Sequence, residues 1–139
     1  MLKVAVVDGQ GGGIGSLIVK RLREEFGDSI EITALGTNAA ATMAMMKSGA
    51  DKGASGENAL SWNTGKVNII TGPISIILPN AMLGELTPAM AEAVSSSPAR
   101  KILIPLSQEN VDIIGITREP LPHLVEELIE NLKETIKNV

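Results

Sequence analysis

The sequence predicts an α/β fold in which a mostly parallel sheet lies between two layers of helices. Strand-like and helix-like segments alternate along the first half of the chain, and that order favours parallel strands joined by crossover helices. The first segment, residues 2–7, is a nearly continuous β-branched run, as in strands that are buried on both faces. The last segment, residues 122–137, carries apolar residues at helical spacing and is expected to pack on the sheet.

The first helix is expected over residues 14–26, because apolar residues recur every four positions from Ile14 to Phe26. Gly27 follows as a C-terminal cap. A strand at residues 30–35 comes next, and then a helix of small residues that runs to about Lys47 and is closed by Gly49. This part of the chain therefore has the order strand, helix, strand, helix.

Residues 50–66 and 74–86 have weaker patterns. In the first stretch we expect a short strand near residues 52–54 and a helical segment near residues 58–62. Residues 67–71 form the next strand, which Gly72 and Pro73 are expected to stop. Residues 74–78 are open between a strand, a buried loop and a short helix. Thr87 then caps a helix that begins at Pro88 and runs to about Ser96.

Residues 101–105 and 111–116 have the composition of two further strands. The few residues between them cannot hold a parallel crossover, which needs about a dozen residues or more. We therefore expect these strands to form an antiparallel hairpin at one edge of the sheet.

The composition limits the classes of function. The chain has 139 residues and a net charge of -4, with scattered cations, so we expect one domain, residues 1–139, and no nucleic-acid partner. It has no cysteine and one histidine, which excludes thiolate and histidine-rich metal sites, and we expect no metal. No signal-peptide pattern and no clean apolar run of about 20 residues is present, so a cytoplasmic location without membrane contact is expected.

A glycine cluster between the first strand and the first helix is the strongest functional signal. Gly9, Gly13 and Gly15 fit the spacing Gly-x-x-x-Gly-x-Gly, which is similar to that of short-chain dehydrogenases. Glycines allow a tight turn and a close ligand, and the amides at the start of a helix attract phosphate. The pattern predicts a Rossmann-like three-layer sandwich with an anion site, although a tight turn that needs glycine only for packing is the alternative.

Two departures limit the analogy with dehydrogenases. The acidic residue that ordinarily holds ribose hydroxyls at the end of the second strand is replaced by Gly36, Thr37 and Asn38. The chain also has no tyrosine, the acid/base of short-chain dehydrogenases, so that chemistry is excluded. The cofactor stays unknown, with NAD(P) or another nucleotide as open options, and the catalytic residues stay unknown.

Asparagine follows three strand-like segments, at Asn38, Asn58 and Asn80. The carboxyl ends of parallel strands meet at one edge of the sheet, so these side chains either gather around a ligand or cap the helices that follow. Asp8 ends the first strand and either contacts the ligand or caps nearby amides. The roles of Glu57 and Glu85 are open between solvated side chains and groups of the crevice.

The motifs DGQGGGIG (residues 8–15), ALGTNA (34–39), GENA (56–59), TGPI (71–74) and MLGE (82–85) resemble a short bacterial family classed as a domain of unknown function. The resemblance extends over nearly the whole chain. It implies a Rossmann-like fold and brings no activity or catalytic residues.

We therefore predict a nucleotide- or phosphate-binding protein that forms a homo-oligomer. Dinucleotide binding through the N-terminal glycine loop is one option within this prediction. The alternative is an oligomeric regulatory or scaffold protein with no ligand in the crevice. The predicted ligand contacts are Asp8, Gly9, Gly11, Gly12, Gly13, Gly15, Thr37, Asn38 and Asn58.

Overall fold

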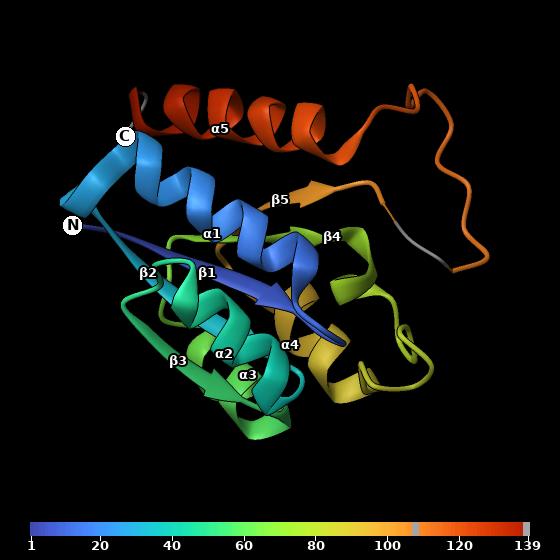
Figure 1. Ribbon diagram of the computed structural model, residues 1–139. Helices are drawn as coiled ribbons and strands as arrows, with labels where there is room; N and C mark the ends of the chain where they lie inside the picture. The colour runs from blue at the N-terminus through green and yellow to red at the C-terminus, as the bar shows by residue number, and fades with distance from the viewer. Residues whose placement is uncertain (107–108, 138–139) are drawn as a thin grey trace.

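The computed structural model describes residues 1–106 and 109–137 and contains one parallel sheet of five strands. The strands follow the order β3-β2-β1-β4-β5 across the sheet (Figure 1). Each neighbouring pair is parallel, as in a chain in which helices connect the strands. The strands are β1 (Leu2–Asp8), β2 (Ile30–Gly36), β3 (Lys52–Ser55), β4 (Ile69–Pro73) and β5 (Arg100–Ile104).

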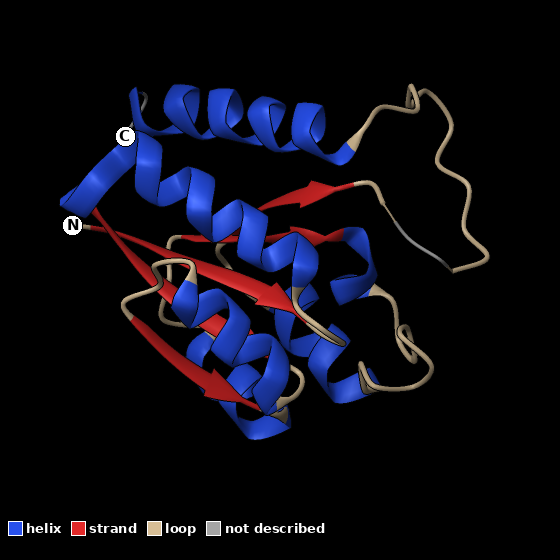
Figure 2. Cartoon of the chain, viewed as in Figure 1, coloured by secondary structure: helices blue, strands red, loops and turns tan. Residues whose placement is uncertain are grey.

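The helices cover both faces of the sheet, which confirms the predicted layers. Buried residues of α1, α2 and α5 share one core, and those of α3 and α4 share the other. Figure 2 shows the strands between these two groups of helices. The helices are α1 (Gly13–Phe26), α2 (Ala39–Lys47), α3 (Glu57–Asn63), α4 (Pro88–Ser96) and α5 (Leu121–Lys137), and short 3-10 helices are η1 (Gly27–Ser29) and η2 (Ile74–Ile77).

Strand β1 lies at the centre of the sheet and is buried on both sides. Val4 and Val6 belong to the core under α1 and α5, whereas Ala5 and Val7 belong to the core under α3 and α4. Side chains alternate between the faces of a strand, so a strand between two helical layers must be apolar at every position. The continuous aliphatic run at the start of the chain is explained by this position.

The order in which strands are added to the sheet changes direction at β1. From β1 the chain proceeds through β2 to β3, at one edge, and β4 and β5 then lie on the other side of β1. In open α/β sheets the loops after the two strands at such a switch point diverge, and ligands bind in the crevice between them. Here these are the loops after β1 and β4.

The predicted antiparallel hairpin is wrong. β5 pairs in parallel with β4, because α4 lies between them in the chain and serves as the crossover. Residues 111–116 form no strand, because Ile114 and Gly115 lie in a turn in which Gly115 has a φ of 89°. The prediction assumed that the two segments pair with each other, whereas β5 takes β4 as its partner.

The predicted end of β4 is also wrong, because the strand continues through Gly72 and Pro73. Pairing between β1 and β4 reaches only Thr71, and Pro73 pairs with Ile104 of β5. Proline lacks an amide proton and is tolerated where no neighbour needs that donor. Pro73 lies beyond the paired part of β1, so its missing amide costs no hydrogen bond there.

The weakly patterned stretches are now assigned. The short strand and helix expected within residues 50–66 are confirmed as β3 and α3, and residues 74–77 form the 3-10 helix η2. In the described part of the chain, no helix combines the length and apolar character needed to cross a membrane.

Candidate functional site

The glycine loop, residues 9–12, joins β1 to α1 at the switch point and is held by Asp8. The side chain of Asp8 is buried, and its Oδ1 accepts a hydrogen bond from the amide of Gly9 at 2.8 Å. Its Oδ2 accepts one from the amide of Gly15, in the first turn of α1, at 2.7 Å. Asp8 therefore caps the helix from the preceding strand and fixes both ends of the loop.

Two glycines are required by close contacts around this loop. A Cβ on Gly15 would lie 2.9 Å from Cβ of Asp8, so a side chain there would push α1 away from β1. Gly12 has a φ of 73° and its Cβ would lie 2.9 Å from Cα of Ala41 in α2. Both positions favour glycine for packing as well as for any ligand.

Three amides at the tip of the loop are left for a ligand. Within residues 1–106 and 109–137, the amides of Gly11, Gly13 and Ile14 donate to no protein acceptor. Gly11 and Gly13 are exposed, and the space where their side chains would stand is open. Free amides at a helix N-terminus attract anions, because the helix dipole adds to their partial positive charge.

Glu85, from the loop between η2 and α4, contacts both the glycine loop and the end of β2. Its Oε1 accepts hydrogen bonds from the amide of Gln10 at 2.7 Å, from the side chain of Asn38 at 2.5 Å and from the hydroxyl of Thr37. Three donors from two loops thus converge on one oxygen. Its Oε2 accepts no hydrogen bond from the described residues and stays available.

The two carboxylates have pKa values shifted in opposite directions. Burial raises the pKa of Asp8 and outweighs the two amide hydrogen bonds, and the nearby charge of Glu85 adds to the rise. Burial also acts to raise the pKa of Glu85, but the three hydrogen bonds that it accepts prevail and lower it. Glu85 is therefore ionised at neutral pH, and its charge is localised by fixed donors.

The segment that carries Glu85 has an unusual backbone. Asn80, Met82 and Leu83 have φ values of 67°, 60° and 59°, in the left-handed region that non-glycine residues rarely adopt. Such conformations cost roughly 1–3 kcal/mol each and persist where the surrounding contacts impose them. The hydrogen bonds of Glu85 are such contacts, because they hold this loop across the carboxyl end of β1.

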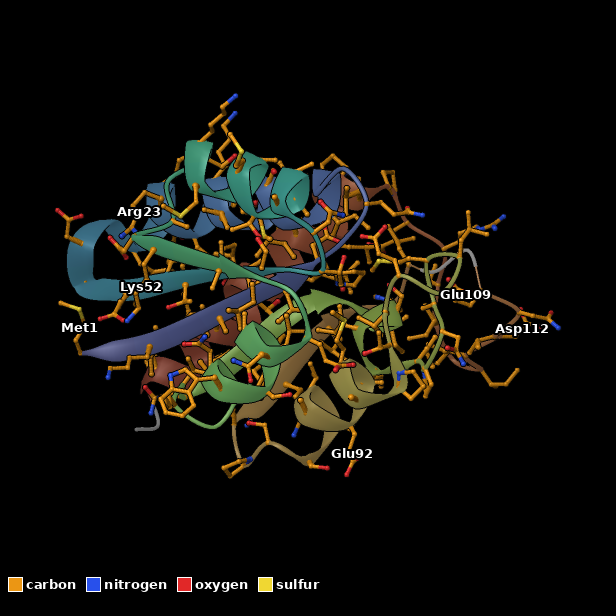
Figure 3. All side chains as sticks on the ribbon, turned by 90° about the horizontal axis from the view of Figure 1, so that it is seen from below. Met1, Arg23, Lys52, Glu92, Glu109 and Asp112 are labelled. Carbon is orange, nitrogen blue, oxygen red and sulfur yellow. The ribbon has the colours of Figure 1, made fainter. Side chains whose placement is uncertain are left out.

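A cavity of about 390 Å³ opens on the β4 side of the glycine loop. Among the described residues, its walls combine apolar side chains with two carboxylates, an amide and a hydroxyl, and include no lysine or arginine. Figure 3 shows Glu109, one of these carboxylates, at the opposite end of the molecule from Arg23 and Lys52. The cavity is lined by Asp8, Gln10, Ile14, Pro73, Ser75, Met82, Leu106, Glu109 and Leu121.

The structure brings together most of the predicted ligand contacts. Thr37 and Asn38 lie beside the glycine loop, and Asn38 also caps α2 through the amide of Ala41 at 2.8 Å. Asn58 lies in the first turn of α3, which follows the edge strand β3, and makes no hydrogen bond with the loop in the part that is described. Asn80 is exposed in the strained segment, so the three asparagines do not converge.

The sequence left the role of Glu85 open, although it is central to the site. It is 48 positions from Thr37 in the chain, so no local pattern links the two residues. The glycine, asparagine and proline residues around Glu85 do predict a loop, and in this fold a loop after a strand lies at the carboxyl edge of the sheet. The described residues contain no group of three or more His, Cys, Asp or Glu placed to hold a metal ion.

Comparison with known proteins agrees with the fold. A family model described as a domain of unknown function (DUF3842) matches residues 3–137, as the sequence motifs suggested. No curated protein matches the chain. A crystal structure of a dodecameric FMN-dependent Ubix-like decarboxylase from Escherichia coli O157:H7 is similar, with a TM-score of 0.57 and 13% sequence identity. The match covers 96% of this chain and 95% of that chain, and it confirms the Rossmann-like α/β fold.

Replacement of Asp8 by asparagine is expected to destabilise the protein. The amide side chain has one acceptor oxygen, so the amide of Gly9 or Gly15 loses its partner inside the protein. The loss of such a buried hydrogen bond costs about 1–3 kcal/mol, and urea unfolding measures it. Glu92→Gln, at an exposed residue of α4, is the control and should change the free energy by less than about 0.5 kcal/mol. Equal stability of the two variants would contradict the capping role.

The lowered pKa of Glu85 makes its contribution to stability dependent on pH. The stabilisation is fully present above the ordinary glutamate value of 4.5 and is lost as the pH falls through the lowered value. The free energy of unfolding of the wild type should therefore approach that of Glu85→Gln in acid, as followed by urea unfolding over a pH series. Glu92→Gln, on the exposed face of α4, controls for the loss of one surface charge. A difference in the free energy of unfolding between wild type and Glu85→Gln that is independent of pH would contradict a stabilising role of the ionised Glu85 side chain.

Proposed function

The chain belongs to the DUF3842 family, a domain family of unknown function, and we propose that it binds a nucleotide around the glycine loop. The observation that carries this proposal is the group of free amides of Gly11, Gly13 and Ile14 beside a cavity at the switch point. The phosphate lies on the amides and the base or another flat ring enters the cavity. Gln10 and Ile14 connect the two parts, because both residues line the cavity.

The position of Asp8 limits where the phosphate binds. The amides of Gly9 and Gly15 are already taken by its carboxylate, which also repels anions. The phosphate therefore binds at the outer tip of the loop, near Gly11 and Gly13, where the dipole of α1 still attracts it. No catalytic residue is assigned.

Glu85 supports a dinucleotide in particular. Its free Oε2 lies at the end of β2, where the acidic residue that accepts ribose hydroxyls stands in dinucleotide-binding folds. A carboxylate there accepts hydrogen bonds from a ribose diol and repels a 2′-phosphate. In this arrangement NAD is favoured over NADP, with one ribose near Glu85, the phosphates over the loop, and the other half in the cavity.

The structural neighbour supports a mononucleotide as the second ligand class. That decarboxylase is FMN-dependent, and FMN combines one phosphate with a flat ring, the two groups that the amides and the cavity suit. The decarboxylase is also a dodecamer, and a homo-oligomer is part of our proposal. A cytoplasmic location belongs to it too, because free nucleotides are abundant there. A scaffold without a ligand is the alternative, favoured by the exposed aliphatic residues near Ile114.

Ligand screening by thermal shift tests the proposal. The panel contains FMN, NAD⁺, NADP⁺, ATP, a sugar phosphate and inorganic phosphate. A nucleotide that binds only the folded state adds about 2.7 kcal/mol of stability at 100 times its dissociation constant. Gly13→Val should weaken binding of that nucleotide at least tenfold, because the new side chain enters the open space over the amides.

Gly65→Val is the matched control for the glycine variant. Gly65 also faces open space and has no left-handed φ, but it lies before β4 and outside the site. This variant should bind as the wild type does. No shift with any nucleotide, or unchanged binding to a folded Gly13→Val protein, is the outcome that rejects the proposed site.

The role of Glu85 is tested with pairs of ligands that differ only at the ribose, NAD⁺ with NADP⁺ and AMP with 2′-deoxy-AMP. Calorimetry should show that the wild type prefers the free diol. Glu85→Gln should reduce this preference by about tenfold, the effect of one hydrogen bond to a charged group. The surface variant Glu92→Gln should retain it. If the wild type binds both members of each pair equally, Glu85 does not select the ribose.

A further inference from the structure

Residues 110–118, which we name the arm, are all exposed and lie in the loop that extends away from the body between β5 and α5 (Figures 1 and 2). Ile114 is 95% exposed, Ile116 50% and Val111 44%. Aliphatic residues exposed singly are common on protein surfaces, but a contiguous group marks a contact surface. The arm therefore has the character of an interface.

The arm also has the sequence of a strand without a partner in its own chain. Its β-branched residues favour the extended conformation. Among the backbone hydrogen bonds of the described residues, the arm contributes one, from the amide of Val111 to the carbonyl of Glu109 at 2.7 Å. Its remaining amides and carbonyls are open to another chain, as they are at the edge of a sheet.

The same chain carries a surface that complements the arm. β5 pairs with β4 alone among the described strands, so its outer edge is open. Next to it a hollow of about 540 Å³ lies between β5, α5 and the arm of the same copy, which contributes Ile113, Gly115, Ile116 and Thr117 to its walls. Its walls include Ile102 and Ile104 from β5 and Leu124 and Leu128 from α5.

We propose that the arm docks against the β5 edge and the hollow of a second copy of this chain. Exchange of arms in both directions gives a two-fold symmetric contact, in which the same surface serves both copies. The nine arm residues and the eight hollow residues from β5, η2 and α5 amount to 17 residues per copy, just below the roughly 20–30 of a stable interface. An open edge pairs readily with an added strand.

The proposal rests on the homo-oligomer of the proposed function and names the surface that forms it. It also connects assembly to the ligand site. Leu106, Glu109 and Leu121, from the two ends of the loop that bears the arm, line the cavity beside the glycine loop. An arm that is held by a partner therefore holds one wall of that cavity.

Sedimentation velocity of the full chain over a concentration series tests the proposal. The wild type should form dimers or larger assemblies, and Ile114→Asp should sediment as a monomer with an unchanged circular dichroism spectrum. The side chain of Ile114 is exposed, so the fold of one copy does not need it. Leu83→Asp is the matched control, because Leu83 is fully exposed and lies outside the arm. That variant should assemble as the wild type does.

Hydrogen exchange supplies a second measurement that needs no variant. The amides of residues 112–117 should exchange slowly in the assembled wild type and quickly on dilution to the monomer. A wild type that is monomeric at every concentration overturns both the arm contact and the homo-oligomer. An assembly that survives Ile114→Asp, or in which the arm amides exchange quickly, overturns the arm contact and leaves the homo-oligomer standing. Met43 is an exposed residue of α2. An assembly that is lost in Met43→Asp and kept in Ile114→Asp also overturns the arm contact, and it assigns the contact between copies to α2.

Discussion

The buried carboxylate of Asp8 is the interaction on which the site depends. It joins the end of the central strand to the first turn of α1 through two backbone amides, and it thereby determines the path of the glycine loop. The close approach that this bond demands explains Gly15, since any side chain there would meet Asp8 itself. Because the innermost amides are satisfied within the chain, the amides left for an anion are those at the exposed tip.

Glu85 is the second carboxylate of the crevice, and it is held in a different way from Asp8. Asp8 is buried and bound by backbone, whereas Glu85 comes from a strained loop and is held by donors on two other loops. The segment around it crosses the carboxyl end of β1 and separates a β2 side from a β4 side. None of the described residues that line the cavity is a lysine or arginine, so in the proposed site the attraction for a phosphate would come from backbone dipoles. Such a site favours ligands whose hydroxyl and ring groups contribute much of the affinity.

The errors of the sequence-based prediction concern pairing. Residues 111–116 have strand propensity, and the short connection from residues 101–105 favoured a hairpin. Propensity describes one segment, while a strand forms only with a partner, and the better partner for β5 was β4, about 30 residues earlier along the chain. The prediction that β4 stops before Pro73 also considered one segment without its neighbours, because it counted only the missing amide of proline. Whether a missing amide matters depends on how far the neighbouring strand extends.

Local sequence alone determined the elements β1, α1, α2 and α5, the caps of α2 and α4 by Asn38 and Thr87, and the glycine loop that follows Asp8. Each of these depends on residues close together in the chain, where apolar spacing, capping and turn chemistry operate. The tertiary structure alone decided the partner of β5, the separation of Asn58 from the glycine loop, and the place of Glu85 in the crevice. These depend on contacts between distant segments, and such contacts exist only after the sheet has brought the strand ends to one edge.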